Sequence, residues 1–221
     1  MLQFGSRHHS YLELLGATSK LSRLLPAGVT NGRVIEFMCD FMPTKFSTTQ
    51  TNEALLGTYL GPAWFEYDAP TTNTAIVAPI RFGTIRNATD KYSGDGEIQL
   101  GKRTVVYGKD DMTNVSAWQD GVALGSATSQ ADWTPAEASR SFATPAEWFF
   151  GHDDSASLYT NLRLYEAWVK VNGTLIMHYL PTENDSTTLP DQSPLANDGT
   201  VSGTEGTDFR YGEAWQKVAS P

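Results

Sequence analysis

L-R-L-Y-E-A-W-V-K-V-N-G-T-L-I-M-H-Y-L, residues 162–180, consists of two apolar runs joined by the dipeptide Asn172-Gly173. A second stretch of the same design, V-S-A-W-Q-D-G-V-A-L-G-S at 115–126, has Asp120-Gly121 at its centre. Asn-Gly and Asp-Gly tolerate the positive φ angles of a type I′ turn, whose twist matches that of paired antiparallel strands. The two stretches therefore predict two β-hairpins, and with them an antiparallel β protein.

Alternation of apolar and polar residues is the main pattern in the rest of the chain. In R-V-I-E-F-M-C-D-F-M, residues 33–42, one face of an extended strand carries Ile35, Phe37, Cys39 and Phe41. We expect that face in the core and the other face, with Val34, Glu36, Met38 and Asp40, to be wetter. Turn residues separate roughly ten to fourteen such short strands, as is typical of a sandwich or jelly roll.

The predicted fold class is all-β, an antiparallel two-sheet jelly-roll sandwich. A length of 221 residues suits one domain of this kind, and helical periodicity is almost absent. We expect an N-terminal arm at 1–10, the jelly-roll domain at 11–202 and a Gly-rich C-terminal tail at 203–221.

The composition limits the classes of function. Forty per cent of the residues are apolar, and six Trp, nine Tyr and ten Phe can fill a core between two sheets. The net charge of −9 argues against a nucleic-acid partner, because binding the phosphate backbone needs a clustered basic surface. No segment approaches the ~20 apolar residues of a membrane helix, so we expect no membrane insertion. The single cysteine, Cys39, excludes an internal disulfide and is expected to be a small core residue.

From about residue 114 onwards, the order of motifs resembles the concanavalin A-like, laminin G-like jelly-roll superfamily. W-Q-D-G-V at 118–122 is followed by W-F-F-G at 148–151 and by L-R-L-Y at 162–165, where the family often has I-R-I-Y. D-Q-S-P-L-A-N-D-G-T at 191–200 resembles the family's polar segment D-x-S-x-x-x-N-D-G-T. The resemblance implies a concanavalin A-like sandwich.

The segment N-G-T-L, followed by Y-L-P at 179–181 and the D-x-S loop, is similar to modules of bacteriophage virion proteins and bacterial surface proteins. The N-terminus has no apolar stretch of signal-peptide length. A virion protein assembles in the host cytoplasm without secretion, so these two observations together favour a location in a virion.

The superfamily includes β-glucanases, so paired carboxylates are the first chemistry to consider. Retaining glycosidases place two carboxyl groups ~5 Å apart across the sugar. The glucanase signature E-x-D-x-x-E is absent, and the nearest pair, Glu36 and Asp40, lies ~13 Å apart along an extended strand. Glu97 and Glu166 stand alone, and no G-x-S-x-G elbow accompanies the four histidines. We therefore expect a protein that is not an enzyme, with no catalytic residues.

Calcium is the one cofactor that the resemblance suggests, because laminin G-like modules often hold it at a loop rim with carboxylates and carbonyls. Asp153 and Asp154 follow directly after an apolar strand, and Asp191 and Asp198 could approach them. Carboxylate oxygens are the ligands that calcium prefers. The alternative is that these residues stabilise turns by hydrogen-bonding nearby backbone N–H groups.

Exposed aromatic rings would provide a carbohydrate-binding surface, since flat π faces match the C–H-rich faces of sugars. Most of the six tryptophans lie on predicted strands and are expected in the core. Trp133, in a long loop, and Trp64 are the candidate ligand-binding residues.

Three functions remain open. The first is a non-enzymatic structural or decorating component of a bacteriophage virion, such as a head decoration, fibre or tail-associated protein, with capacity to bind a host-surface glycan. The second is a carbohydrate-binding lectin-like module on a cell surface, and the third a glycan-active hydrolase. We place the first ahead, because the chain carries no catalytic motif and no export signal.

A virion component needs partners, and we expect other virion proteins and a homo-oligomer, with a trimer as the first choice. The expected assembly contacts are the apolar residues of the arm and tail: Leu2, Phe4, Phe209, Tyr211 and Trp215. The alternative is that the tail folds back over its own sheet.

Overall fold

The computed structural model describes residues 10–16, 19–24, 31–32, 34–46, 52–58, 63–68, 76–86, 89–111, 114–125, 140–141, 147–151, 161–182 and 186–213. These residues form nineteen β-strands and no helix, so the described part of the chain is all-β, as predicted. No helix that could span a membrane occurs among them. The strands outnumber the ten to fourteen expected in part because three of them have only two residues, too few for any alternation to be visible in the sequence.

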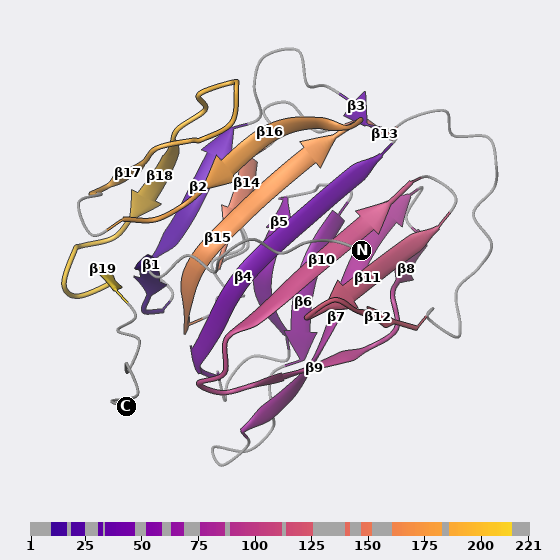
Figure 1. Cartoon of the computed structure of the whole chain (residues 1–221), viewed down its shortest axis with the longest axis horizontal. Helices are drawn as coiled ribbons and strands as arrows, with labels where there is room; N and C mark the ends of the chain where they lie inside the picture. The colour runs from indigo at the N-terminus through magenta and orange to yellow at the C-terminus, as the bar shows by residue number, and fades with distance from the viewer. Residues whose placement is uncertain are drawn as a thin grey trace, which may run out of the picture.

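The first layer is an eight-stranded antiparallel sheet, seen face-on in Figure 1. Its long central strands lie side by side although they come from opposite ends of the chain. In order, the sheet consists of β12 (Val122–Leu124), β11 (Val115–Gln119), β10 (Thr104–Asp110), β4 (Ile35–Lys45), β15 (Asn161–Val171), β1 (Ser10–Leu14) and β19 (Phe209–Glu213), with β16 (Thr174–Tyr179) also paired to β15.

The second layer is a nine-stranded antiparallel sheet. It consists in order of β17 (Thr188–Leu189), β18 (Gly199–Ser202), β2 (Lys20–Leu24), β14 (Glu147–Phe150), β5 (Asn52–Thr58), β6 (Ala63–Asp68), β7 (Val77–Arg86) and β8 (Thr89–Tyr92), with β9 (Gly96–Gln99) also paired to β7. A separate two-stranded sheet joins β3 (Asn31–Gly32) to β13 (Arg140–Ser141).

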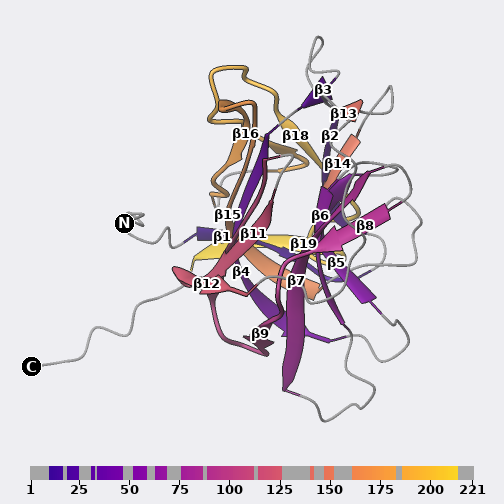
Figure 2. The ribbon, with the colours of Figure 1, turned by 90° about the vertical axis from the view of Figure 1, so that its right-hand side faces the viewer.

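The core lies between the two layers, which Figure 2 shows edge-on. The expected core face of β4 is confirmed: Ile35, Phe37, Cys39 and Phe41 are all fully buried. Phe37 meets Phe82 of the opposite sheet edge-on, with ring centroids 5.6 Å apart. Burial also raises the pKa of the Cys39 thiol, which therefore stays protonated and unreactive.

Both predicted hairpin tips are confirmed. Asp120 and Gly121 have φ of 48° and 82°, and Asn172 and Gly173 have φ of 51° and 80°. These are the left-handed values that a type I′ turn requires at both central positions. The Asp120 carboxylate also accepts a hydrogen bond of 2.9 Å from the backbone N–H of Val105, so this turn is tied to the neighbouring strand.

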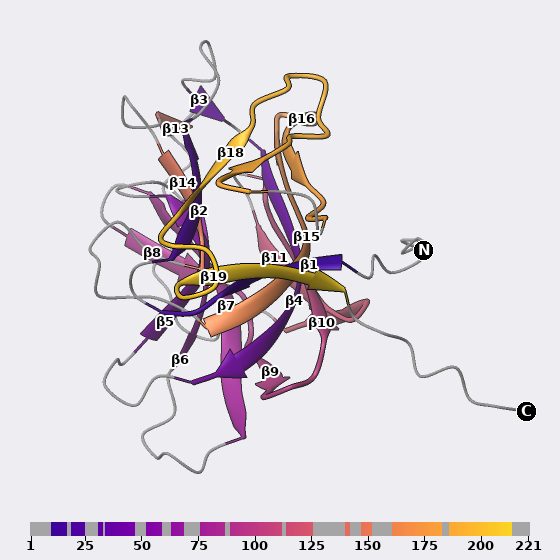
Figure 3. The same cartoon turned by 90° about the vertical axis from the view of Figure 1, so that its left-hand side faces the viewer.

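The C-terminal boundary at residue 202 is wrong, because residues 209–213 form β19 and pair with all five residues of β1 (Figure 3). Phe209 is fully buried in the shared core, and Tyr211 packs against that core. A strand can bury one face only when its backbone groups are also paired, and β1 provides that pairing. The sandwich therefore includes β19, as in the alternative in which the tail folds back.

Candidate functional site

The outer face of the eight-stranded sheet carries a row of large side chains that crosses the strands. Strand register places Trp118, Tyr107, Met38, Trp168 and His178 directly opposite one another on β11, β10, β4, β15 and β16. Neighbouring strands lie ~4.8 Å apart, so the row spans ~19 Å. We call these five residues the aromatic row.

The three aromatic rings of the row contact one another over the surface of the sheet. The ring of Tyr107 lies 5.1 Å from that of Trp118 and 5.8 Å from that of Trp168, centroid to centroid, at tilts of 36° and 48°. Met38 lies between Tyr107 and Trp168 in the register and is only 6% exposed. The three rings are themselves half-buried, so each keeps part of its surface available to a ligand.

A row of three charged residues, the charged row, lies beside the aromatic row, one outward-facing position further along β10, β4 and β15. Lys109 and Lys170 both lie opposite Glu36, on either side of β4. The Tyr107 hydroxyl donates a hydrogen bond of 2.6 Å to the Glu36 carboxylate, and the Lys170 ammonium lies 4.6 Å from the Trp168 ring centroid. Burial, and then the bond to Glu36, raise the pKa of Tyr107, so its hydroxyl remains a donor.

Two carboxylates lie on the other side of the aromatic row. Asp40 and Glu166 are directly opposite each other on β4 and β15, so Glu166 is not isolated, contrary to expectation. Asp40 accepts two bonds of 2.8 Å from the Arg103 guanidinium, and Glu166 lies 2.9 Å from His178 Nε2. Each carboxylate therefore has its own basic partner, an arrangement that fixes side chains.

A β-bulge explains how this part of β15 presents its side chains. The register with β4 shifts between Leu164 and Glu166, so Tyr165 is an extra residue, and Tyr165 and Glu166 both lie on the outer face. Tyr165 is 3% exposed because the Arg103 guanidinium covers its ring at 3.7 Å and Tyr11 packs on its edge. The bulge thereby buries an outward-facing tyrosine under an arginine.

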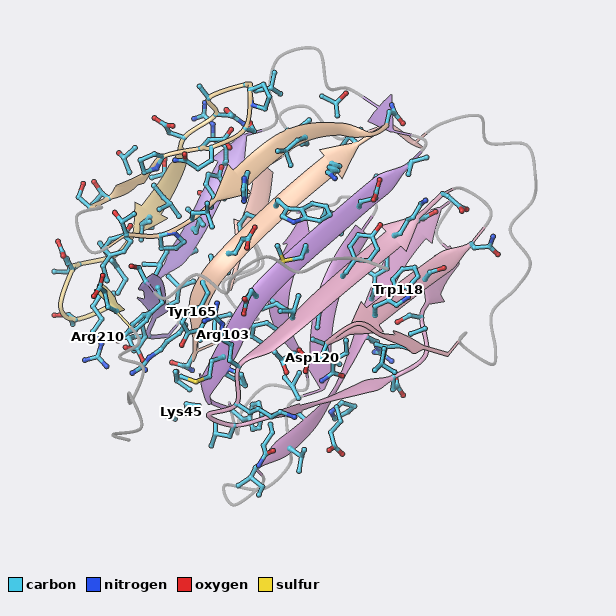
Figure 4. All side chains as sticks on the ribbon, in the orientation of Figure 1. Lys45, Arg103, Trp118, Asp120, Tyr165 and Arg210 are labelled. Carbon is cyan, nitrogen blue, oxygen red and sulfur yellow. The ribbon has the colours of Figure 1, made fainter. Side chains whose placement is uncertain are left out.

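An ion-pair network closes this face at β1 and β19. The Glu13 side chain, 4% exposed, accepts bonds from Arg163 and Arg210, one on each carboxylate oxygen. Arg163 also lies over the Tyr11 ring at 4.5 Å. In Figure 4, Lys45, Arg103, Tyr165 and Arg210 lie on the left of the sheet, and Trp118 lies to their right. The aromatic row and the arginine network are thus separate regions of one surface.

The expected wetter face of β4 is less exposed than predicted. Asp40 is 4% exposed and Met38 is 6% exposed, although both point away from the core. Arg103 covers Asp40, and the rings of Tyr107 and Trp168 flank Met38. Side chains of the same face, and not the opposite sheet, are responsible for this burial.

The polar segment at 191–200 is a structural loop. The Asp191 carboxylate accepts bonds from the backbone N–H groups of His178, Ser193 and Asn197 at 2.7–2.8 Å, and from the Ser193 hydroxyl at 2.5 Å. Asp198 accepts a bond of 3.0 Å from the Asp191 N–H. Both residues are engaged with the backbone, as the turn-forming alternative predicts.

No cluster of three or more acidic, histidine or cysteine side chains suited to a metal occurs in the described part of the chain. Asp153 and Asp154, the candidate calcium ligands, lie outside it, so calcium binding stays a prediction. Trp133, Leu2, Phe4 and Trp215 also lie outside the described residues. Only the backbone of Trp64 is described, as part of β6.

Two expected assembly contacts have partners within the chain. Phe209 is buried by its own domain, so its assignment as a contact with another subunit is wrong. Tyr211 is partly buried against the same core, and its hydroxyl donates a hydrogen bond of 2.6 Å to the Ser186 carbonyl.

The tryptophans of the aromatic row were expected in the core, and that expectation is wrong for Trp118 and Trp168. The signal that could have identified Trp168 is its alternation, because Glu166 and Lys170 occupy the same face of β15. Ala167 and Val169 are buried on the opposite face. An aromatic residue in phase with charged neighbours therefore indicates an outward-facing ring.

Comparisons with solved structures agree on the architecture. A putative carbohydrate-binding protein from Bacteroides ovatus superimposes with a TM-score of 0.64 at 10% identity over 94% of this chain. This chain covers 60% of the length of that protein. A native heptameric SAP-like pentraxin from Limulus polyphemus superimposes with a TM-score of 0.53 at 11% identity. The superposition covers 73% of this chain and 76% of the pentraxin chain.

Comparisons at the level of sequence give no relative. No protein-family profile matches the chain, and no curated protein matches it either. The structural likenesses, at 10–11% identity, show the fold alone: this chain is an antiparallel jelly-roll sandwich.

Proposed function

We propose that this chain is a non-enzymatic glycan-binding module whose ligand lies along the aromatic row. The observation that carries the proposal is the alignment of three half-buried rings, Trp118, Tyr107 and Trp168, in one register row on the outer face of the eight-stranded sheet. Both structural neighbours have a lectin-like fold, and carbohydrate binding is ascribed to the Bacteroides protein. That ascription supports this class of ligand for the present chain.

The geometry of the row suits an extended saccharide. Sugars present C–H-rich faces that pack on aromatic rings, and hydroxyl groups that need polar partners at the edge of the contact. The rings of the row provide the surfaces on which the sugar faces pack, and the flanking side chains of Glu36, Lys109 and Lys170 provide polar partners for the hydroxyl groups. A span of ~19 Å accommodates several sugar units.

The carboxylates of this face support a binding role in preference to hydrolysis. A retaining glycosidase needs one carboxyl group as a proton donor and the other as an accessible nucleophile. Asp40 has both oxygens bonded to Arg103 and is nearly fully buried. Glu166 is paired with His178. Neither group is presented to a substrate as that mechanism requires.

We place the module in a bacteriophage virion, as a structural or decorating component that assembles as a homo-oligomer. The motif order from residue 114 to 200 supports this location, and a trimer remains our first choice. The second candidate is a lectin-like module on a cell surface, which the likeness to the Bacteroides protein favours equally. Immunogold labelling of purified particles and of host cells distinguishes the two locations.

The test of glycan binding is a glycan array probed with the purified protein and with Trp118→Ala and Trp168→Ala. Each variant should weaken binding roughly tenfold, which corresponds to about 1.4 kcal/mol of lost stacking and burial. Leu195→Ala, an exposed apolar residue on the 191–200 loop, is the control and should bind as the wild type does. Absence of binding to any glycan, or unchanged binding by both tryptophan variants, would contradict the proposal.

A further inference from the structure

We propose that the ligand of the aromatic row is an acidic glycan, whose anionic group is received by Lys109 and Lys170. This inference rests on the proposed glycan-binding function and specifies the class of ligand. Both lysines occupy the charged row, opposite Glu36 and one outward-facing position away from the rings. Two residues along a strand correspond to ~6.7 Å, which the long lysine side chain can span.

The Lys170 side chain extends along its strand as far as the aromatic row. Its ammonium lies 4.6 Å from the centroid of the Trp168 ring, over a surface on which a sugar would stack. Lys109 has the equivalent position beside Tyr107, since both are outward-facing residues of β10. A sugar that packs on either ring therefore comes within reach of an ammonium group.

The balance of charge in the charged row favours an anion. One acidic residue, Glu36, lies between the two lysines in the strand register, and its carboxylate accepts a hydrogen bond from the Tyr107 hydroxyl. A neutral sugar would replace the water around these lysines with hydroxyl groups only, so their positive charges would lose hydration without gaining a charged partner. An anionic group on the sugar would complete the pairing with charge-assisted hydrogen bonds.

The outer face as a whole differs in charge from the rest of the protein. The chain has 16 basic and 25 acidic residues. On the described strands of this face the outward-facing basic and acidic residues are equal in number: Lys109, Lys170, Arg163 and Arg210 against Glu36, Asp40, Glu166 and Glu13. Arg103, which directly precedes β10, adds a further basic side chain to this face. Three of these acids, Asp40, Glu166 and Glu13, are paired with Arg or His. An acidic ligand would therefore meet less repulsion on this face than the net charge of −9 for the whole chain suggests.

The experiment compares matched ligands on an array, each acidic saccharide printed beside its methyl ester, with sulfated saccharides as a separate arm. The acid should bind about tenfold more tightly than its ester, in line with two partly exposed ion pairs. This preference should shrink as salt rises, because such pairs are screened. The sulfated arm shows whether the site requires a carboxylate or accepts any anionic group.

The variants separate this inference from the function on which it rests. Lys109→Gln combined with Lys170→Gln should abolish the preference for the acid over its ester, while the binding that remains should still depend on Trp118 and Trp168. Lys102→Gln, an exposed lysine on the turn before β10, removes the same charge and should keep the preference. Equal binding of acid and ester, or a preference that survives in the double variant, overturns the inference alone. Loss of all aromatic-dependent binding overturns the proposed function, and the inference with it.

Discussion

Replacing Phe209 by alanine tests whether the C-terminal segment belongs to the core of the domain. Phe209 is fully buried in the core cluster, and its ring lies edge-on to Tyr211 at 6.0 Å. Truncating a buried phenylalanine removes its burial and leaves a cavity, which together cost about 3–5 kcal/mol. Domains of ordinary stability have about 5–15 kcal/mol in total, so the variant should unfold far more readily.

The assay is chemical denaturation followed by tryptophan fluorescence, analysed for both midpoint and slope. Arg210→Ala is the matched control, because the adjacent side chain is 54% exposed on the outer face and its removal should cost no more than about 1 kcal/mol. The midpoint for Phe209→Ala should not depend on protein concentration, since the core that surrounds this side chain belongs to the same chain. A destabilisation below about 1 kcal/mol, or one that depends on concentration, would show that Phe209 contributes to an interface between subunits.

Three further outcomes test other parts of the structure. Gly199→Ala should destabilise the fold by about 1–3 kcal/mol, because its Cβ would lie 2.6 Å from the Leu21 side chain, and a loss below about 0.5 kcal/mol measured by denaturation would contradict this close packing. Gly173→Ala, at φ +80° in open space, should cost about 1–2 kcal/mol through backbone strain alone, and no measurable loss would contradict that strain. Burial raises the pKa of Tyr179 above its ordinary value of about 10. The free energy of unfolding should therefore be independent of this group below pH ~10 and should fall above it by up to ~1.4 kcal/mol per pH unit, because the unfolded chain loses the phenol proton first. Tyr179→Phe should lose stability less steeply when the two proteins are compared over the same pH range. The purified protein should release no reducing sugar from β-glucans or bacterial surface polysaccharides, and turnover that disappears in Glu166→Gln would restore the hydrolase function.

The aromatic row shows why the functional surface was harder to predict than the fold. Tyr107 and Glu36 are 71 residues apart in the sequence, yet their side chains are joined by a hydrogen bond of 2.6 Å. Trp118, Tyr107 and Trp168 come from three strands, and only their pairing places the rings in contact. A shift of one residue in any of these strands would turn its ring to the opposite face.

The pairing of Asp40 with Glu166 also depends on strand register and could not be predicted from the sequence. Considered alone, Glu166 has no acidic neighbour in the sequence at a useful spacing, and Asp40 appears paired only with Glu36 along one strand. The bulge at Tyr165 sets which residue of β15 lies opposite Asp40. A bulge adds one residue to one strand of a pair, and no feature of the surrounding sequence identified its position.

Features that depend on a few neighbouring residues could be predicted from the sequence alone. The turns at Asp120-Gly121 and Asn172-Gly173 follow from backbone φ preferences, and the core face of β4 follows from the alternation of its side chains. Three other arrangements became visible only in the folded chain: β19 pairs with β1, the Trp168 ring contacts the Tyr107 ring, and Lys109 and Lys170 flank Glu36. These arrangements depend on the register between strands distant in the sequence, which is fixed by the packing of the whole core at once and not by any local preference.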